Sequence, residues 1–239
     1  MIGKPKNSLP PSPMANRESD KLRRHSVADQ PSLVSDPTDR AEAEARNGLK
    51  QFDLGLEIVE DALAKGSAFR WRPSMIQALH REALMGISEF AGNWRPAGVG
   101  IEGSAHQPVG AHLVPEFIEE LCDYLNEHHD DTTPIHRAAY AMWRLNWIHP
   151  FSDGNGRTSR IFSYVVLCVG LGFALRGSTT IPDQIVANRQ PYFEALEQAD
   201  ATCKRGLIDV SAMEALLKRL LAVQLTGVFD KAIGARSLD

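Results

Sequence analysis

The sequence predicts an all-α helical bundle with one short β-hairpin, and three observations support this. From residue 40 onward, apolar residues recur at helical spacing, and strict alternation is rare. Segment 91–112 is the long exception, because it contains five glycines and two prolines. Residues 1–40 hold six of the 14 prolines, six serines and no aromatic residue, so they cannot bury enough apolar surface to order themselves. We expect a disordered or loosely ordered tail over 1–40 and one domain over 41–239, with its core at about 75–205.

The first part of the domain contains signals for two helices and the hairpin. Apolar residues form one stripe over 40–64, which ends at Lys65 and Gly66. A second helix is expected after Pro73, a residue type that favours the first helical turn. Alternation from Val99 to Glu102, between glycines, predicts a hairpin that projects at about 96–109.

Helical periodicity resumes after the hairpin. The remaining helices are expected over 113–127, 134–148, 157–175, 190–204 and 209–229. Small residues in the helix that ends at Ile148 indicate close packing against a neighbour. Segment 157–175 is apolar almost all round, which is typical of a helix at the centre of a bundle.

Charge and hydropathy exclude two classes of partner. The net charge is −4, of which the first forty residues contribute +2, so the remainder has a net charge of −6 and is a poor match for nucleic-acid polymers. The longest apolar run, 161–175, is shorter than the roughly 20 residues that span a bilayer. No continuous apolar segment follows Lys4 and Lys6, so we expect no conventional secretory signal and no membrane partner.

Two groups of residues that suggest sulfur or metal chemistry have simpler explanations. Three cysteines, Cys122, Cys168 and Cys203, are too few and too far apart for a disulfide framework or a zinc knuckle. They are expected to be small core residues in a reducing compartment. The polar run 127–131 with His136 has no spacing typical of a zinc site, and a polar helix end explains it.

The loop with the strongest functional pattern is 149–160, His-Pro-Phe-Ser-Asp-Gly-Asn-Gly-Arg-Thr-Ser-Arg. Gly154 and Gly156 permit positive φ angles that turn backbone N–H groups toward one point, where the next helix N-terminus adds partial positive charge. Arg157 and Arg160, three residues apart, can both hold phosphate oxygens.

Two other groups of this loop complete the chemistry. Asp153 offers a hard oxygen ligand for Mg²⁺, and His149 titrates near neutrality, which makes it the candidate base. Each piece alone has a structural explanation, since Asp-Gly-Asn-Gly is commonly a turn. Their combination within twelve residues predicts a site for a metal-bound polyphosphate beside a base.

The loop resembles the Fic family signature, His-Pro-Phe-x-Asp/Glu-Gly-Asn-Gly-Arg-x-x-Arg, at every specified position. The similarity extends through 90–95 and 188–196, so it covers most of residues 45–205. It implies the α-helical Fic fold and an enzyme, a protein adenylyltransferase. Such a nucleotidyltransferase transfers AMP from ATP to a Ser, Thr or Tyr hydroxyl of a target protein and releases pyrophosphate.

The resemblance also implies roles for single residues. His149 would deprotonate the target hydroxyl, Asp153 would hold Mg²⁺ between the α- and β-phosphates, and Phe151 would anchor the loop in the core. Arg157 and Arg160 would orient the β- and γ-phosphates. The residues implied in nucleotide binding are Gly154, Asn155, Gly156, Arg157, Arg160 and Tyr192. Aromatic residues near the adenine explain Tyr192 and Phe193, and core packing of the helix over 190–204 explains them equally well.

Partners follow from the same resemblance. The hairpin at about 96–109 resembles a flap that clamps a segment of the target protein by strand addition. The family includes bacterial toxins and effectors, so the expected location is the cytoplasm, or a host cell after secretion as an effector. A homodimer stays open.

Regulation by an inhibitory helix, Ser/Thr-x-x-x-Glu-Gly/Asn, is a further implication. The upstream match is Thr38 to Glu42, although Ala43 stands where Gly or Asn is expected, and Thr226 to Asp230 is a weaker downstream match. If Glu42 is inhibitory, Glu42→Gly is expected to raise self-modification. Otherwise a separate small antitoxin-like protein is the inhibitor, or there is none.

Two alternative functions stay open at this stage. One is Fic-type transfer of another phosphate-containing group, namely UMP, phosphocholine or phosphate. Intact Gly156 and Arg157 favour nucleotidyl transfer, because kinase-like members of the family are altered there. The other alternative is a non-catalytic Fic-fold binding module, which the complete set of catalytic residues disfavours.

Overall fold

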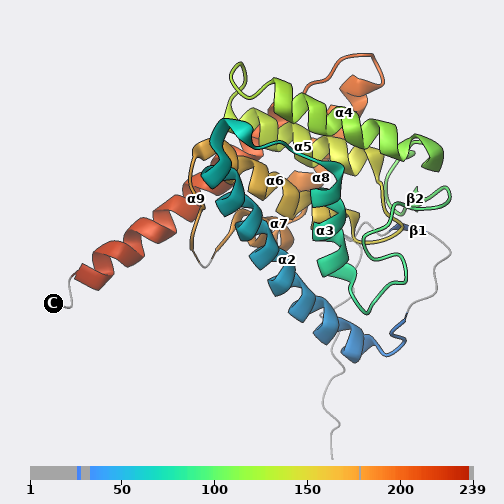
Figure 1. The fold of residues 1–239 in the computed structure, drawn as a ribbon, viewed down its shortest axis with the longest axis horizontal. Coiled ribbons are helices and arrows are strands. Elements are labelled where there is room, and N and C mark those ends of the chain that lie inside the picture. The colour runs from blue at the N-terminus through green and yellow to red at the C-terminus, as the bar shows by residue number, and fades with distance from the viewer. Residues whose placement is uncertain (1–25, 28–32, 178, 237–239) are drawn as a thin grey trace, which may run out of the picture.

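A computed structural model describes residues 26–27, 33–177 and 179–236, and over these residues helices dominate the fold (Figure 1). The helices are α2 (Pro37–Lys65), α3 (Pro73–Leu84), α4 (Val114–Glu127), α5 (Pro134–Ile148), α6 (Asn155–Leu171), α7 (Ile181–Ala187), α8 (Gln190–Cys203) and α9 (Ser211–Arg236). Short 3₁₀ turns lie at Gly66–Ala68 and Ala111–Leu113. Two strands, β1 (Ser26–Val27) and β2 (Gly100–Ile101), pair antiparallel. The all-α prediction is confirmed.

Helix ends follow local signals in the sequence. The Asp36 carboxylate accepts hydrogen bonds from the backbone N–H groups of Thr38 and Asp39, at 2.8 and 3.0 Å, and so caps α2. Gly172 adopts φ 81° and ends α6 at Leu171. The predicted end at residue 175 is therefore too late, because the left-handed glycine turns the chain away.

Helix α7 was not expected from the periodicity. Thr180 caps it by accepting from the Asp183 N–H, while the Asp183 side chain accepts from the Thr180 N–H. With seven residues, α7 is too short to show a helical repeat. The capping box was the available signal.

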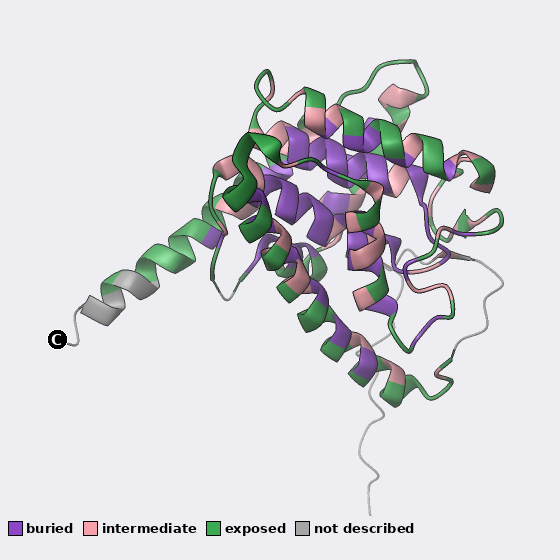
Figure 2. Ribbon diagram, viewed as in Figure 1, coloured by how far each residue is buried: buried purple, intermediate pink, exposed green. Residues whose placement is uncertain are grey.

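The core lies between α5 and α6, which are buried along most of their length (Figure 2). The predicted close packing is present, since Ala138, Ala139 and Ala141 are all buried on α5. Ser163 on α6 donates a hydrogen bond to the Ala138 carbonyl at 2.7 Å, which satisfies a buried hydroxyl between the two helices. This tightly packed pair places the connection between α5 and α6 at one end of the core.

The hairpin prediction needs a correction. Residues 96–109 do contain a strand, β2, but its partner is β1 from the N-terminal part of the chain. Ser26 pairs with Ile101, and Val27 pairs with Gly100. A single sequence shows alternation in one strand but not which distant segment will pair with it.

The expectations for the N-terminal part and for the cysteines are met only in part. Helix α2 begins at Pro37, slightly before residue 41. Most of the predicted tail, residues 1–25 and 28–32, lies outside the described residues. Cys122 and Cys168 are buried as expected, while Cys203 is only half-buried. Among the described residues, no helix combines the length and apolar character needed to cross a bilayer.

Phe162 tests the importance of the α6 core. Its side chain is fully buried and meets Trp71 edge to face, with ring centroids 5.5 Å apart. Phe162→Ala should lower the free energy of unfolding by about 3–5 kcal/mol, because it leaves a cavity in a close-packed core. Phe173→Ala is the matched control, since Phe173 is exposed. Urea denaturation measures both, and equal losses would contradict the assignment of Phe162 to the core.

Candidate active site

A cavity of about 570 Å³ lies beside the site loop, which we define as residues 149–156, that is, the connection after α5 and the first two residues of α6. Its lining includes every residue predicted for catalysis, metal binding or nucleotide binding: His149, Asp153, Gly154, Asn155, Gly156, Arg157, Arg160 and Tyr192. Phe193 on α8 lines it as well. The fold therefore brings the predicted residues of two distant segments, 149–160 and 192–193, to one cavity.

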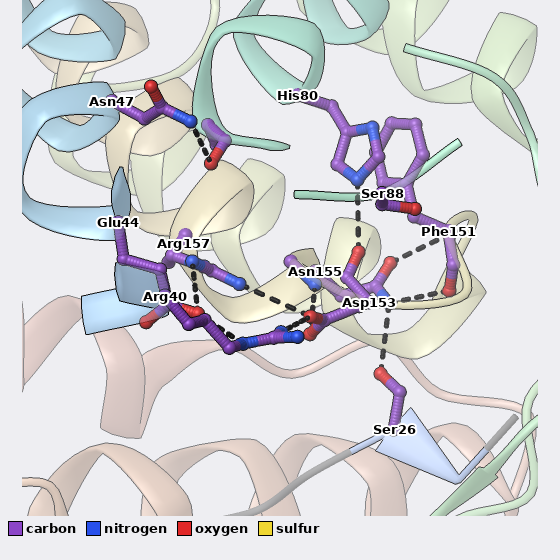
Figure 3. A network of polar contacts seen from close by, with 12 residues as sticks. Ser26, Arg40, Glu44, Asn47, His80, Ser88, Phe151, Asp153, Asn155 and Arg157 are labelled. Atoms are coloured by element: carbon purple, nitrogen blue, oxygen red, sulfur yellow. Dashed lines mark hydrogen bonds and ion pairs between the residues drawn. The ribbon is translucent and has the colours of Figure 1, made fainter. Parts of the chain in front are cut away.

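The site loop is fixed by Phe151 and Asn155. Phe151 is completely buried, as expected for an anchor, and its ring stacks on His80 with centroids 3.6 Å apart. The Asn155 side chain accepts from the Phe151 N–H at 2.9 Å and donates to the Phe151 carbonyl at 2.7 Å (Figure 3). Because this amide is already bonded to the loop, it stabilises the loop conformation from within.

His80 on α3 is a loop-holding residue whose role the sequence did not reveal. Its Nδ1 accepts from the Gly92 N–H at 2.9 Å, so its Nε2 has the proton and donates to the Asp153 carbonyl at 3.0 Å. Burial lowers the pKa of His80 to about 4, which keeps the ring neutral. The available signal was a histidine on the apolar face of a helix, since a buried polar ring needs partners.

Arg95 joins the site loop to the 96–109 loop. Its buried guanidinium donates to the carbonyls of His149 at 2.8 Å, of Ala97 at 2.9 Å and of Val109. Its backbone N–H donates to the Pro150 carbonyl at 2.9 Å. Because the Arg95 guanidinium forms hydrogen bonds with both loops, it holds strand β2 beside the site loop.

His149 has the geometry of a proton acceptor. Its backbone is left-handed, with φ 52°, and its N–H closes the end of α5 by donating to Leu145. Nδ1 lies 3.3 Å from the Asn146 carbonyl, which can only accept, so Nδ1 bears the proton and Nε2 has the free lone pair. Burial lowers the pKa of His149 to about 4, which leaves the imidazole neutral at physiological pH.

The start of α6 provides an anion-binding position. Gly154 adopts φ 75°, and a Cβ there would lie only 2.5 Å from the Leu84 side chain, so glycine is required. Gly156 lies in the first turn of α6 and its φ is not positive, which corrects the prediction that both glycines form the nest. The unpaired N–H groups of the first helical turn remain the source of partial positive charge.

An ion-pair network fills part of the cavity (Figure 3). The Asp153 carboxylate lies 2.9 Å from Arg40 Nη2 and 3.3 Å from Arg157 Nη2. Glu44 on α2 lies 3.0 Å from Arg40 Nε and 3.3 Å from Arg157 Nη1. Burial raises the pKa of Asp153, but Arg157, the Gly154 N–H and Arg40 outweigh it and lower the pKa below its usual range.

The position of Glu44 corrects the expectation for Glu42. Glu42 lies beside Asp39 and Arg46 at a different cavity, while Glu44 lines the cavity of the site loop. Residues two apart on a helix point to different sides, so Glu44 and not Glu42 faces the site loop. Arg157 Nη1 is buried without a hydrogen bond despite its ion pair with Glu44, and a phosphate oxygen would satisfy it.

Tyr192 and Arg160 also line the cavity. Tyr192 is buried on α8, and its hydroxyl lies 3.5 Å from the Ser159 hydroxyl. Its ring belongs to the hydrophobic core and also lines the cavity, so both explanations of this residue hold in part. Burial lowers the pKa of the Arg160 guanidinium, which is partly exposed.

Part of the chain matches a known protein family. Residues 70–167 match the family model described as Fic/DOC. This segment is a Fic domain. The protein adenylyltransferase Fic of Drosophila persimilis is 32% identical over 123 residues, which are 51% of this chain and 23% of that protein. The match therefore spans less than a quarter of that relative's length.

Solved structures share the fold at low sequence identity. A Fic family protein from Desulfovibrio desulfuricans aligns with a TM-score of 0.59 at 21% identity and covers 83% of this chain and 56% of that one. A Fic-domain-containing signalling protein from Bacteroides thetaiotaomicron gives a TM-score of 0.60 at 22% identity, covering 75% and 70%. These likenesses extend the Fic fold well beyond residues 70–167.

Removing Glu44 should open the anion position. Glu44→Ala frees Arg157 from a half-exposed ion pair, so the dissociation constant for inorganic tripolyphosphate should fall by about fivefold, or roughly 1 kcal/mol. Glu42→Ala, two residues away on the same helix, is the control and should change nothing. Titration calorimetry measures both affinities. A response to Glu42→Ala instead would restore the motif-based assignment.

Acid should weaken the fold through its two buried histidines. The unfolded chain binds these protons near pH 6.5, but folded His80 and His149 bind them only near pH 4. The free energy of unfolding should therefore fall as pH drops through this window, by up to roughly 3 kcal/mol for His80.

Two variants test that pH dependence in urea denaturation between about pH 7 and pH 4. His80→Ala should make the slope of unfolding free energy against pH shallower. His129→Ala should leave the slope as in the wild type, because His129 is exposed. An unchanged slope in His80→Ala would show that the His80 ring is not held neutral in the fold.

Proposed function

We propose that this protein is an adenylyltransferase that transfers AMP from ATP to a hydroxyl group of a protein and releases pyrophosphate. The observation that supports it most is a neutral base, His149, in the same cavity as Arg157, Arg160 and the start of α6. A base beside a polyphosphate position is what nucleotidyl transfer needs. Relatives that are named protein adenylyltransferases give independent support.

The reaction divides among the residues of the cavity as follows. His149 Nε2 takes the proton of the acceptor hydroxyl as its oxygen attacks the α-phosphorus, and the bond to the β-phosphate breaks. Arg157, Arg160 and the first N–H groups of α6 hold the phosphates and balance the charge that develops. The pyrophosphate leaves with the bonding electron pair, and His149 returns its proton to solvent.

Mg²⁺ fits this site as an ion that arrives with the nucleotide. Across the described residues, no group of three or more His, Cys, Asp or Glu side chains could hold a metal ion, and Asp153 is the carboxylate of the loop. Mg²⁺ keeps several waters and commonly uses one or two carboxylates with substrate phosphates, which suits a single carboxylate. The ion would neutralise phosphate charge, and Asp153 would have to release Arg40 to hold it.

The acceptor protein is proposed to dock on β2. Arg95 fixes the ends of the 96–109 loop, and His106 Nε2 lies 2.8 Å from the Trp147 carbonyl of α5. An acceptor segment would bind the edge of β2 through backbone hydrogen bonds in the place that β1 takes in this structure. This mode depends little on the side chains of the acceptor, which leaves its sequence open to many targets.

Labelled nucleotides test the proposed reaction. Incubation with Mg²⁺ and [α-³²P]ATP should label protein, and His149→Ala should reduce the rate by about 10²–10⁴-fold, because the base is lost. His129→Ala, at the exposed end of α4, is the control and should retain activity. Label from [γ-³²P]ATP would indicate phosphate transfer instead. No transfer from ATP, UTP or CDP-choline would leave a binding module.

A further inference from the structure

Ser26 lies where the acceptor of the proposed reaction is needed. Its hydroxyl oxygen is 2.8 Å from His149 Nε2, across 123 positions of the chain. Because Nδ1 of His149 bears the proton, Nε2 accepts and the Ser26 hydroxyl donates. A hydroxyl that donates to a neutral imidazole is the arrangement of a nucleophile with its general base.

A second contact orients the same hydroxyl. Asn155 Nδ2 donates to Ser26 Oγ at 3.3 Å, so one lone pair of the oxygen faces the first residue of α6 (Figure 3). Ser26 lines the cavity together with Arg157 and Arg160. The oxygen is thus between the base and the end of the helix where phosphate is expected.

The backbone around Ser26 supports the same interpretation. β1 pairs antiparallel with β2, with Ser26 opposite Ile101. This is the strand addition proposed for an acceptor protein, here made by the chain's own N-terminal part. The strand pairing and the hydroxyl contact together place Ser26 where an acceptor side chain is needed.

We propose that Ser26 is an adenylylation site of this chain and that it is modified by the chain's own active site. This inference rests on the proposed function. His149 Nε2 takes the Ser26 proton, Ser26 Oγ forms a bond to the α-phosphorus of ATP, and the bond between the α-phosphorus and the β-phosphate oxygen breaks. The products are a Ser26–AMP phosphodiester and pyrophosphate, and the proton passes from His149 to solvent.

The ion pairs around Asp153 set a condition for this reaction. Arg40 and Glu44 occupy Asp153 and Arg157, so nucleotide must displace them before phosphate and metal can bind. Ser26 makes no part of those ion pairs, and its contacts are to His149 and Asn155. The Glu44→Ala chain is therefore a useful second background, in which the acceptor is in place and the anion position is less obstructed.

Peptide mapping gives the direct test. The full-length chain, as wild type and as Glu44→Ala, is incubated with Mg²⁺ and ATP and digested with trypsin. Cleavage after Arg24 and Arg40 gives a peptide with four hydroxyl residues, Ser26, Ser32, Ser35 and Thr38. Fragmentation should place AMP on Ser26, and the other three hydroxyls are internal controls. AMP on any of them with Ser26 unmodified would overturn the proposal.

Matched variants separate the acceptor from the enzyme. Ser26→Ala should reduce self-labelling by [α-³²P]ATP to the level of His149→Ala, while Ser26→Thr, which keeps a hydroxyl, should retain label at position 26. Ser35→Ala removes an exposed serine ahead of α2 and should label like the wild type. Circular dichroism checks that each variant is folded. Full self-labelling of Ser26→Ala would overturn the proposal.

Reaction order distinguishes modification within one chain from modification between chains. The fraction labelled per minute should not change with protein concentration, and a tagged His149→Ala chain mixed with wild type should stay unlabelled. Label on that tagged chain would overturn self-modification within one molecule.

A separate readout keeps this inference distinct from the proposed function. If lysate proteins acquire label and Ser26 does not, the adenylyltransferase stands and the Ser26 proposal falls. If wild type and Glu44→Ala transfer label from ATP neither to themselves nor to lysate proteins, the proposed function falls and the Ser26 site with it.

Discussion

Burial of Phe151 is the constraint on which the site depends. Its ring stacks on His80, and the Asn155 side chain bonds both backbone groups of Phe151, so the chain cannot leave α5 and enter α6 in another way. His149 precedes this anchor and Asp153 follows it, and both are positioned by it. A base and a carboxylate on a short connection hold their places because an aromatic ring between them is part of the core.

The positions of the charged residues matter more for this site than the net charge of the chain. The chain has a net charge of −4, yet Arg40, Arg157 and Arg160 converge on one cavity at the start of α6. Asp153 and Glu44 balance part of that charge, at distances of 2.9–3.3 Å. The cations at the proposed phosphate site are thus paired with carboxylates, and a bound anion would have to compete for them.

The site is not simply an open cavity, because a part of the chain's own N-terminal region lies against it. β1 occupies the edge of β2, and Ser26 contacts the base directly. A protein acceptor that docks by strand addition must therefore compete with a segment of the same chain. Because that segment is covalently attached, its local concentration favours it over any free partner.

The sequence by itself determined the longer helices and their order, and it predicted a chemistry for residues 149–160, because periodicity, caps and a dense motif are local properties. Helix α7 was too short for periodicity, and only its capping box marked it. The tertiary structure decided three things. It placed Glu44 rather than Glu42 beside Arg157, and it brought His80 into hydrogen-bond contact with the site loop. It also paired β2 with β1 instead of with a neighbouring hairpin strand. The physical reason is common to all three, since each depends on contacts between residues that are distant in the chain, and a single sequence does not encode those contacts in any local pattern.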